Sequence, residues 1–303
     1  MKKLFFTMTS FSLIFLFFAC TKESEEEVNS FIDGKFVSTQ YGNVCIWDLI
    51  WTNPREITSD ATWKPVADVG YYDPGYQMPH WSSDGSQIIC IKNSRDNGNS
   101  IWLMDNNGED KEKVFQLNES ILAFDWSNDD KWIAYSTISD GSIYIVSLDG
   151  QEHKILNEKG EYQIRYISWS ADSKKIAFYT NADHLFIVDV TTEEIYKLPY
   201  RSGIRSKPCW SPNDEFLALS KFSNRWGQIV ILKVDDNFAK IVREGYGIFP
   251  VFSWTPDGEY IIYLAGTEFT LEAMQVSTDS IIDLGYKDKI DVDNPRGDIF
   301  IFK

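Results

Sequence analysis

Short apolar runs alternate with polar turns along most of the chain, and one combination of the two returns five times. A tryptophan ends an apolar run and is followed by Ser or Thr, by a turn containing Asp or Asn, and by a run of β-branched and aromatic residues. Such turn residues cap their own backbone, and the run after them favours a strand. The repeated tryptophans lie 41 to 45 residues apart and are Trp81, Trp126, Trp169, Trp210 and Trp254. A period near forty residues with several short strands per copy is typical of a β-propeller.

The two ends of the chain complete this pattern between them. Residues 31–60 contain three strand-like runs but lack the tryptophan turn, and residues 290–302 match the missing strand with Val292 in the place of tryptophan. We therefore predict an all-β, six-bladed β-propeller of four-stranded antiparallel blades, whose first blade is closed by the C-terminal strands. Such closure hides the sheet edges. The repeated tryptophans are predicted to lie in the blade cores, and the turn acids to be structural.

The repeat resembles that of a known family. The turn at residues 254–258 (W-T-P-D-G), the strand at 175–178 (K-I-A-F) and the strand at 185–189 (L-F-I-V-D) are similar to the TolB-like, WD40-related PD40-type propeller repeat. The resemblance covers residues 31–303 and implies the propeller fold. It implies little about activity, because such propellers serve as binding platforms, enzyme domains and assembly factors.

The N-terminus predicts an envelope address. Residues 1–3 are Met-Lys-Lys, residues 4–18 are apolar except for Thr and Ser, and Cys20 follows Ala19, which resembles the lipobox of bacterial lipoproteins. We expect a signal peptide over residues 1–19, a lipidated Cys20 with an acidic tether over 20–30, and the propeller over 31–303. The acidic run resembles the surface-export signal of some Gram-negative lipoproteins. The expected location is the outer membrane, exposed at the surface, with its periplasmic face as the alternative.

Composition narrows the classes of function. A net charge of −16 argues against a nucleic-acid partner, which requires a basic surface, and the hydrophobic content of 43 % fits a folded, strand-rich protein. The three histidines lack metal-ligand spacing, and Cys45, Cys90 and Cys209 lie on apolar strands without a C-x-x-C pair. Neither a glycine-rich phosphate loop nor a nucleophile elbow occurs in the sequence. We therefore expect no cofactor, no metal, no catalytic residue, and free buried thiols.

Departures from the repeat indicate candidate ligand contacts. About twenty residues, several of them aromatic, join Ile57 to Met78, and ordered connections of that length often carry function. His80 precedes a core tryptophan and is expected to line the central channel. Basic residues on adjacent blades lie beside flat aromatic side chains, a combination that suits a carboxylate, a sugar or a peptide turn. This basic cluster consists of Arg201, Arg205, Lys207, Lys221 and Arg225. The alternatives are a connection that plugs the channel and a mixed surface charge. The candidate contacts are Trp63, Tyr72, Tyr76, His80, Arg201, Arg205, Arg225, Trp226 and Tyr246.

The leading hypothesis is a lipid-anchored, non-catalytic binding or scaffolding module. Its ligand would be a glycan, a peptide or an envelope protein on the loop-rich face, and its membrane contact would be the lipidated Cys20. The alternative is a propeller enzyme acting on polysaccharide, of the lyase or glycosidase type, with Asp60, Asp68, Asp73 and Glu244 as candidate acids. A third interpretation is an envelope-assembly partner resembling TolB.

Overall fold

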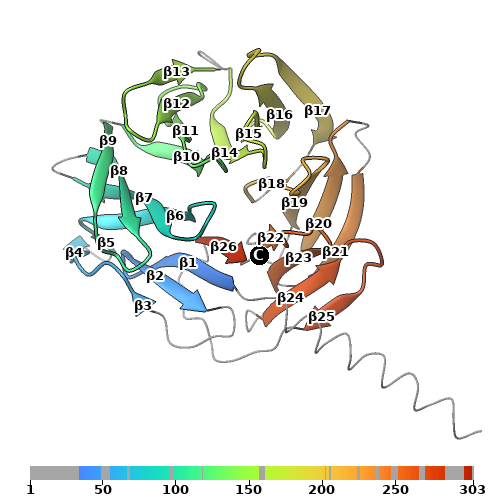
Figure 1. The fold of residues 1–303 in the computed structure, drawn as a ribbon, viewed down its shortest axis with the longest axis horizontal. Coiled ribbons are helices and arrows are strands. Elements are labelled where there is room, and N and C mark those ends of the chain that lie inside the picture. The colour runs from blue at the N-terminus through green and yellow to red at the C-terminus, as the bar shows by residue number, and fades with distance from the viewer. Residues whose placement is uncertain are drawn as a thin grey trace, which may run out of the picture.

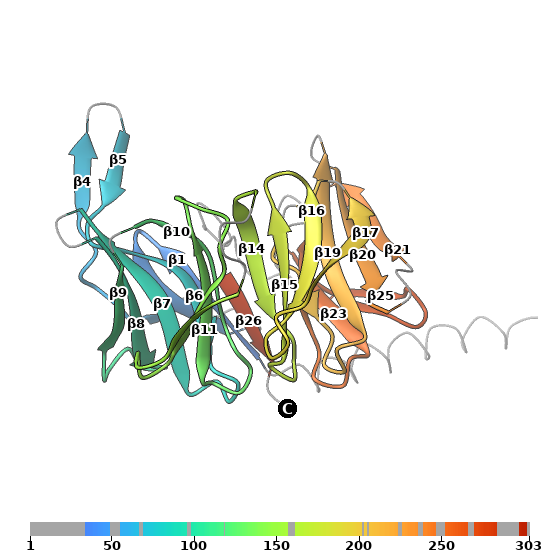
Figure 2. The ribbon, with the colours of Figure 1, turned by 90° about the horizontal axis from the view of Figure 1, so that it is seen from above.

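Six radial sheets form a ring around a common axis (Figures 1 and 2). The computed structural model describes residues 34–48, 55–66, 69–95, 98–117, 119–156, 161–201, 203–204, 206–223, 226–235, 239–246, 252–265, 270–283 and 297–301. All the regular secondary structure within these residues is β-strand. The strands form six four-stranded sheets and one two-stranded sheet. None of these segments is an apolar helix long enough to cross a membrane.

Each blade is an antiparallel sheet of four strands, which are named below in order from the axis outward. Blade 1 contains β26 (Gly297–Ile301), β1 (Gly34–Gln40), β2 (Asn43–Asp48) and β3 (Arg55–Glu56), and blade 2 contains β6 (Gly75–Trp81), β7 (Gln87–Ser94), β8 (Gly98–Asp105) and β9 (Glu112–Leu117). Blade 3 contains β10 (Ile121–Trp126), β11 (Trp132–Thr137), β12 (Tyr144–Ser147) and β13 (His153–Ile155), and blade 4 contains β14 (Ile164–Trp169), β15 (Lys175–Thr180), β16 (His184–Asp189) and β17 (Ile195–Arg201). Blade 5 contains β18 (Cys209–Trp210), β19 (Phe216–Ser223), β20 (Trp226–Lys233) and β21 (Ala239–Tyr246), and blade 6 contains β22 (Phe252–Trp254), β23 (Tyr260–Ala265), β24 (Thr270–Gln275) and β25 (Ile281–Asp283).

The C-terminal strand closes the ring, as predicted. β26 is the innermost strand of blade 1 and pairs antiparallel with β1, with Phe36 opposite Ile299 in the register. It also contacts β6 of blade 2 and β22 of blade 6, so one short strand joins the beginning of the sheet ring to its end. Val292, which the sequence assigns to the same repeat, lies outside the described residues.

Side chains packed between neighbouring blades form the core. Each of five hydrophobic clusters joins two adjacent blades and contains one repeated tryptophan, and these tryptophans are at most 7 % exposed. Trp210 donates a hydrogen bond from its indole nitrogen to Ser168 O of blade 4, and Trp254 donates one to Cys209 O of blade 5. The prediction that the tryptophans are core residues is therefore confirmed. The runs are apolar throughout because blades pack on both faces of most sheets.

The acidic turn after each tryptophan is held by its own hydrogen bonds. In blade 4 the Ser170 hydroxyl donates to Asp172 Oδ1 at 2.8 Å, and the same oxygen accepts from the backbone of Lys174 at 3.0 Å. Equivalent hydroxyl–carboxylate pairs occupy blades 2, 3 and 6, and a serine–asparagine pair occupies blade 5. These acids therefore stabilise turns, as predicted.

The next residue in three of these turns reaches the preceding blade. Asp214 has a φ of +59° and accepts from two backbone N–H groups of the blade 4 turn, at 2.6 and 2.9 Å. Asp130 accepts from the backbone and hydroxyl of Ser83 in blade 2, and the Ser173 hydroxyl accepts from a backbone N–H of blade 3. We call Asp130, Ser173 and Asp214 the blade latches, and the side of the ring that carries them the turn face.

The three cysteines of the described residues are free thiols. Burial is the main cause that raises the pKa of Cys45 to about 11 and that of Cys90 to about 12. Both thiols are therefore protonated near neutral pH, and they behave as small apolar core residues rather than as nucleophiles.

Candidate ligand-binding face

A β-hairpin interrupts the repeat between blades 1 and 2. The long connection predicted from the sequence forms β4 (Trp63–Val66) and β5 (Val69–Tyr72), which pair antiparallel with Trp63 opposite Tyr72. We call this hairpin the arm. It rises above the ring on the side opposite the turn face (Figure 2), because β6 runs from the arm at Gly75 to its turn at Trp81. We call this side the arm face.

An ion pair holds the base of the arm. Asp60 accepts from the Tyr76 hydroxyl at 2.8 Å and pairs with the Lys92 ammonium at 2.5 Å. That ammonium also lies 5.0 Å from the ring centroid of Tyr76 and 4.9 Å from that of Trp102. Burial raises the pKa of Asp60, but the bonds from Lys92 and Tyr76 outweigh burial and leave this pKa below its usual value. The cluster therefore ties the arm to blade 2 with a charge pair that persists near neutral pH.

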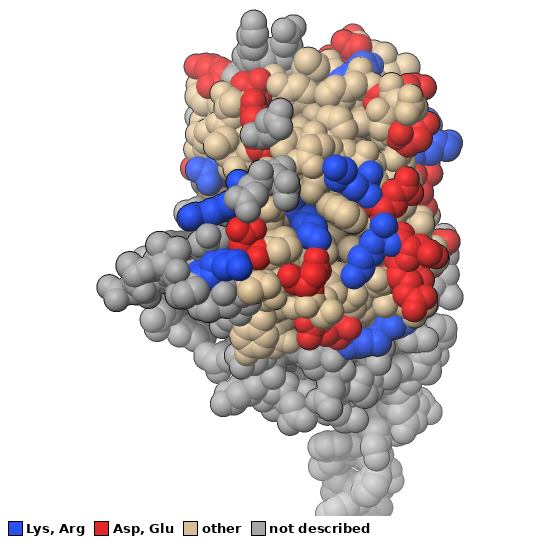
Figure 3. Space-filling view, turned by 90° about the vertical axis from the view of Figure 1, so that its left-hand side faces the viewer, with Lys and Arg blue, Asp and Glu red and all other residues tan. Residues whose placement is uncertain are grey.

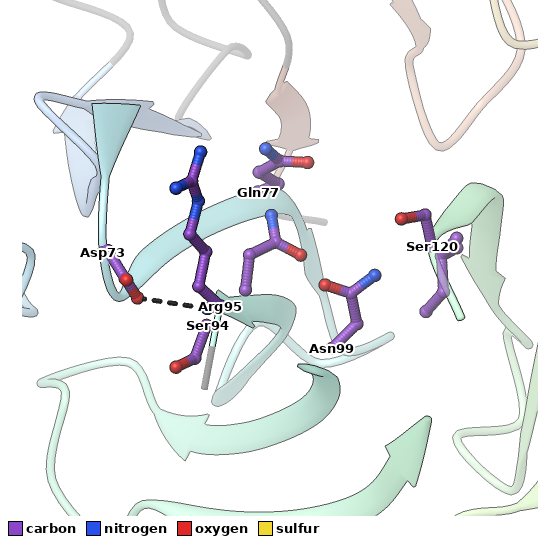
Figure 4. A pocket seen from close by; sticks show the side chains of 8 residues that line it. Asp73, Gln77, Ser94, Arg95, Asn99 and Ser120 are labelled. Carbon is purple, nitrogen blue, oxygen red and sulfur yellow. Dashed lines mark hydrogen bonds between the residues drawn. The ribbon is translucent and has the colours of Figure 1, made fainter. Parts of the chain in front are cut away.

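A polar cavity of about 310 Å³, which we call the recess, lies beside the arm between blades 2 and 3 (Figure 4). β7 and β8 are eight residues long, whereas β11 and β12 of blade 3 have six and four, so the β7–β8 hairpin extends past its neighbour and forms one wall. The recess is lined by Asp73, Gln77, Asn93, Ser94, Arg95, Asn99, Ser120 and Ile121.

A β-bulge in the innermost strand of blade 2 helps to shape the recess. Gln77 pairs with Ile91 and His80 pairs with Ile89, so the two β6 residues between them oppose one residue of β7. One of the two, Met78, has a φ of +48°, which is uncommon for a residue with a side chain. Bulges redirect side chains and are enriched beside functional sites. This bulge leaves Gln77 on the recess wall.

A second cavity of about 320 Å³ lies on the other face of the same hairpin. Successive strand residues face opposite sides, so Ser100 and Trp102 line this cavity, whereas Asn93 and Asn99 line the recess. The Trp102 indole nitrogen donates to the Ser100 hydroxyl at 2.9 Å, and the Lys92 ammonium covers its ring. Internal contacts therefore already engage the aromatic wall of this cavity.

A second charged cluster joins the inner strands of several blades. Asp125 of β10 is 5 % exposed and accepts from Lys207 Nζ and from the backbone of Trp169, both at 2.7 Å. His80 places Nδ1 3.8 Å from the Asp125 carboxylate and 3.5 Å from Lys207 Nζ. We call His80, Asp125 and Lys207 the axial tie. It connects blades 2, 3 and 5 and, through Trp169, blade 4, so we assign it a role in stability.

Two of the candidates are buried and make contacts within the fold. Tyr76 is 2 % exposed, packs in the core between blades 1 and 2, and donates its hydroxyl to Asp60, so it supports the arm. His80 is 9 % exposed and faces Asp125. Trp226, by contrast, is 51 % exposed at the start of β20, where its Cα lies opposite that of Tyr246 in β21.

The described members of the expected basic cluster diverge. Lys207 enters the axial tie, whereas Lys221 Nζ lies 5.3 Å above the ring centroid of Tyr200. The backbone of Arg201 lies in β17, opposite His184. Cys20, Arg205 and Arg225 lie outside the described residues, and so do the side chains of Trp63, Tyr72, Arg201 and Tyr246.

The acids proposed for an enzyme occupy separate environments. Asp60 is paired with Lys92, and Asp73 lines the recess and accepts from the backbone of Arg95 at 3.4 Å. Glu244 lies on β21 of blade 5 and accepts from Gln228 at 3.0 Å. Asp68 lies outside the described residues. Over the part of the chain that the structure describes, no three His, Cys, Asp or Glu side chains are grouped to hold a metal ion.

Sequence reasoning missed most of the recess and the acid of the axial tie. The sequence did contain a signal for the recess, the polar run Asn-Ser-Arg-Asp-Asn-Gly-Asn-Ser at residues 93–100. A short turn between two strands needs fewer polar residues than this run contains. Asp125 occupies the same place before a repeated tryptophan that His80 occupies in blade 2, and an acid at that place on an apolar strand was a second signal.

The protein is thus a six-bladed β-propeller built from tryptophan-turn repeats, and the arm rises from one of its two faces, the arm face. The family described as the TolB beta propeller domain (PD40) matches residues 92–302, and the chain belongs to this family. The Tol-Pal system protein TolB of Francisella tularensis subsp. mediasiatica is 24 % identical over 219 residues, covering 67 % of this chain and 50 % of that protein. The chain thus spans about half the length of the curated relatives it matches.

Solved structures share the fold. TolB from Acinetobacter baumannii aligns with a TM-score of 0.59 and 17 % identity, covering 82 % of this chain and 62 % of that one. A chain of the nidogen/laminin complex aligns with a TM-score of 0.63 and 11 % identity, covering 82 % of this chain and 92 % of that one. At these identities the likeness concerns the fold alone.

Proposed function

We propose that this chain is a non-catalytic binding module of the bacterial cell envelope that holds a partner protein on its arm face. The observation that carries the proposal is the difference between the two sides of the ring. The turn face consists of similar short turns joined by the blade latches. The arm face carries the arm, the recess and the ends of the long hairpins β7–β8 and β19–β20. Recognition residues are commonly found on such variable connections above a rigid scaffold.

The comparisons and the charge support a protein partner in the envelope. The sequence relatives are named proteins of the Tol-Pal system, and a net charge of −16 favours a partner with a basic surface. A lipidated Cys20 would hold the propeller at the outer membrane through the acidic tether. Replacing Cys20 with Ser should abolish incorporation of a labelled fatty acid, and protease treatment of intact cells separates surface display from the periplasmic side.

Site-specific photo-crosslinking in living cells tests the proposal. A photoreactive amino acid replaces Lys64 on the arm or the exposed Trp226 of blade 5, and the exposed Glu259 on the turn face serves as the matched control. We expect one envelope protein to be captured from both arm-face positions and not from the control, and to bind the purified full chain. Capture from the control position alone, or from none of the three, would refute the proposal.

A further inference from the structure

The recess contains polar side chains that the fold does not use. Among the described residues, the side chains of Gln77, Asn93 and Ser120 make no hydrogen bond within the protein, although all three line one cavity. Two primary amides and one hydroxyl supply both donors and acceptors. In the axial tie and at the base of the arm, by contrast, the polar side chains form hydrogen bonds with one another.

The walls of the recess are held in place by neighbouring contacts. The Asn99 amide donates to Glu119 O at 2.9 Å, which connects the β8 wall of blade 2 to the segment that leads into blade 3. The Arg95 backbone donates to Asp73, which connects the hairpin tip to the foot of the arm. Figure 4 shows the labelled side chains arranged around the recess, with Ser120 on the side opposite Asp73. A ligand would therefore meet a frame built by two blades and the arm.

The lining chemistry selects among classes of ligand. Ile121 is the one apolar residue of the lining, so a hydrophobic ligand gains little. Asp73 and Arg95 contribute one charge of each sign, and Figure 3 shows acidic and basic side chains interleaved on the side of the ring that includes blade 2. A strongly charged ligand therefore finds no complementary field. The recess lining combines neutral amides with one carboxylate and one guanidinium. This lining suits a ligand that presents many uncharged hydrogen-bond donors and acceptors.

We propose that the recess is a binding site for a neutral sugar residue of a glycan. Vicinal hydroxyls both donate and accept, so they can pair with the Gln77 and Asn93 amides and with the Ser120 hydroxyl. The volume of about 310 Å³ lies at the lower end of the range for small-molecule sites, about 300–1,000 Å³, which suits a single ring. The proposed sugar site and the proposed partner-binding function have only the arm face in common. The arm and blade 5 positions used to capture a protein partner lie outside the recess lining.

The test is saturation-transfer NMR and calorimetric titration of the purified full chain with glucose, galactose and N-acetylglucosamine. The variants are Gln77→Ala and Asn93→Ala, with Gln151→Ala on the turn face as the matched control. We expect millimolar binding of at least one sugar, weakened roughly three- to tenfold by each recess variant, the value of one neutral hydrogen bond. Gln151→Ala should bind as the wild type does, and unchanged melting curves should show that all three variants fold.

Two outcomes overturn the proposal. One is the absence of saturation transfer to every sugar, and the other is binding that the recess variants leave unchanged. Triglycine serves as a competing probe, because binding of the peptide with loss in the recess variants would reassign the recess to a peptide. Crosslinking from Lys64 and Trp226 is read separately, so a failed sugar site and a failed partner-binding function give different patterns of results.

Discussion

Replacing Lys207 with Met removes the cation from the axial tie and keeps an unbranched side chain of similar length. The Asp125 carboxylate, 5 % exposed, would retain the N–H of Trp169 at 2.7 Å and lose the ammonium at the same distance. Removing one partner of a buried ion pair costs about 3–5 kcal/mol, because an uncompensated charge stays buried. The Lys207 side chain is 34 % exposed, so water screens part of this interaction. We expect a loss of about 2–3 kcal/mol in the free energy of unfolding.

The assay is urea unfolding of the wild type and the variant, followed by tryptophan fluorescence, with thermal melting as a second measurement. A loss of this size corresponds to a drop in Tm of roughly 4–12 °C for a domain of this length. Lys240→Met is the matched control, because Lys240 contacts Asp279 at the same 2.7 Å while both side chains are 40 % exposed or more. That exposed pair should contribute less than about 1 kcal/mol.

A double variant checks the cause of the effect. Adding Asp125→Asn to Lys207→Met removes the stranded charge, so the double variant should regain part of the lost stability. The reasoning is refuted if Lys207→Met destabilises no more than Lys240→Met, or if the double variant is no more stable than Lys207→Met. Either result would mean that the tie does not hold the inner strands together.

Three further perturbations address closure, latches and the arm. Deleting residues 299–303 removes most of β26 and exposes the edge of β1, so Tm should fall sharply; an unchanged melting curve would contradict non-covalent closure. Asp214→Gly removes two charge-assisted hydrogen bonds but relieves a left-handed backbone, so a net loss of about 1–3 kcal/mol is expected in urea unfolding. Asp60 has a lowered pKa in the fold, so its contribution exists above its unfolded pKa of about 3.9 and is lost as the pH falls through the lower folded value. The stability difference between wild type and Asp60→Asn should therefore be constant near neutral pH and shrink in acid; a difference that grows in acid would reverse the assigned sign.

The fifth position of the repeated turn separates what is local from what is not. All five residues there have positive φ, and two of them are the glycines Gly85 and Gly258. Local turn geometry sets that conformation, so the sequence pattern indicates it. Whether the side chain latches a blade depends on the neighbour: Asp214 faces N–H groups of blade 4, whereas Gly258 faces Pro212, which has no N–H to donate. A Cβ on Gly258 would lie 3.6 Å from the proline ring.

The sequence by itself determined the repeated elements of this protein. The blade count, the tryptophan cores, the structural turn acids and the closure by C-terminal strands follow from a period near forty residues, because each blade is a local unit that the repeat describes. Tertiary structure alone decided which departures from the repeat meet in space. Lys207 reaches Asp125 across 82 residues, and Tyr76 is buried in β6 although the arm ends shortly before it in the sequence, at Tyr72. The recess likewise exists because β7 and β8 outgrow the strands of blade 3, a comparison between blades that no local pattern contains.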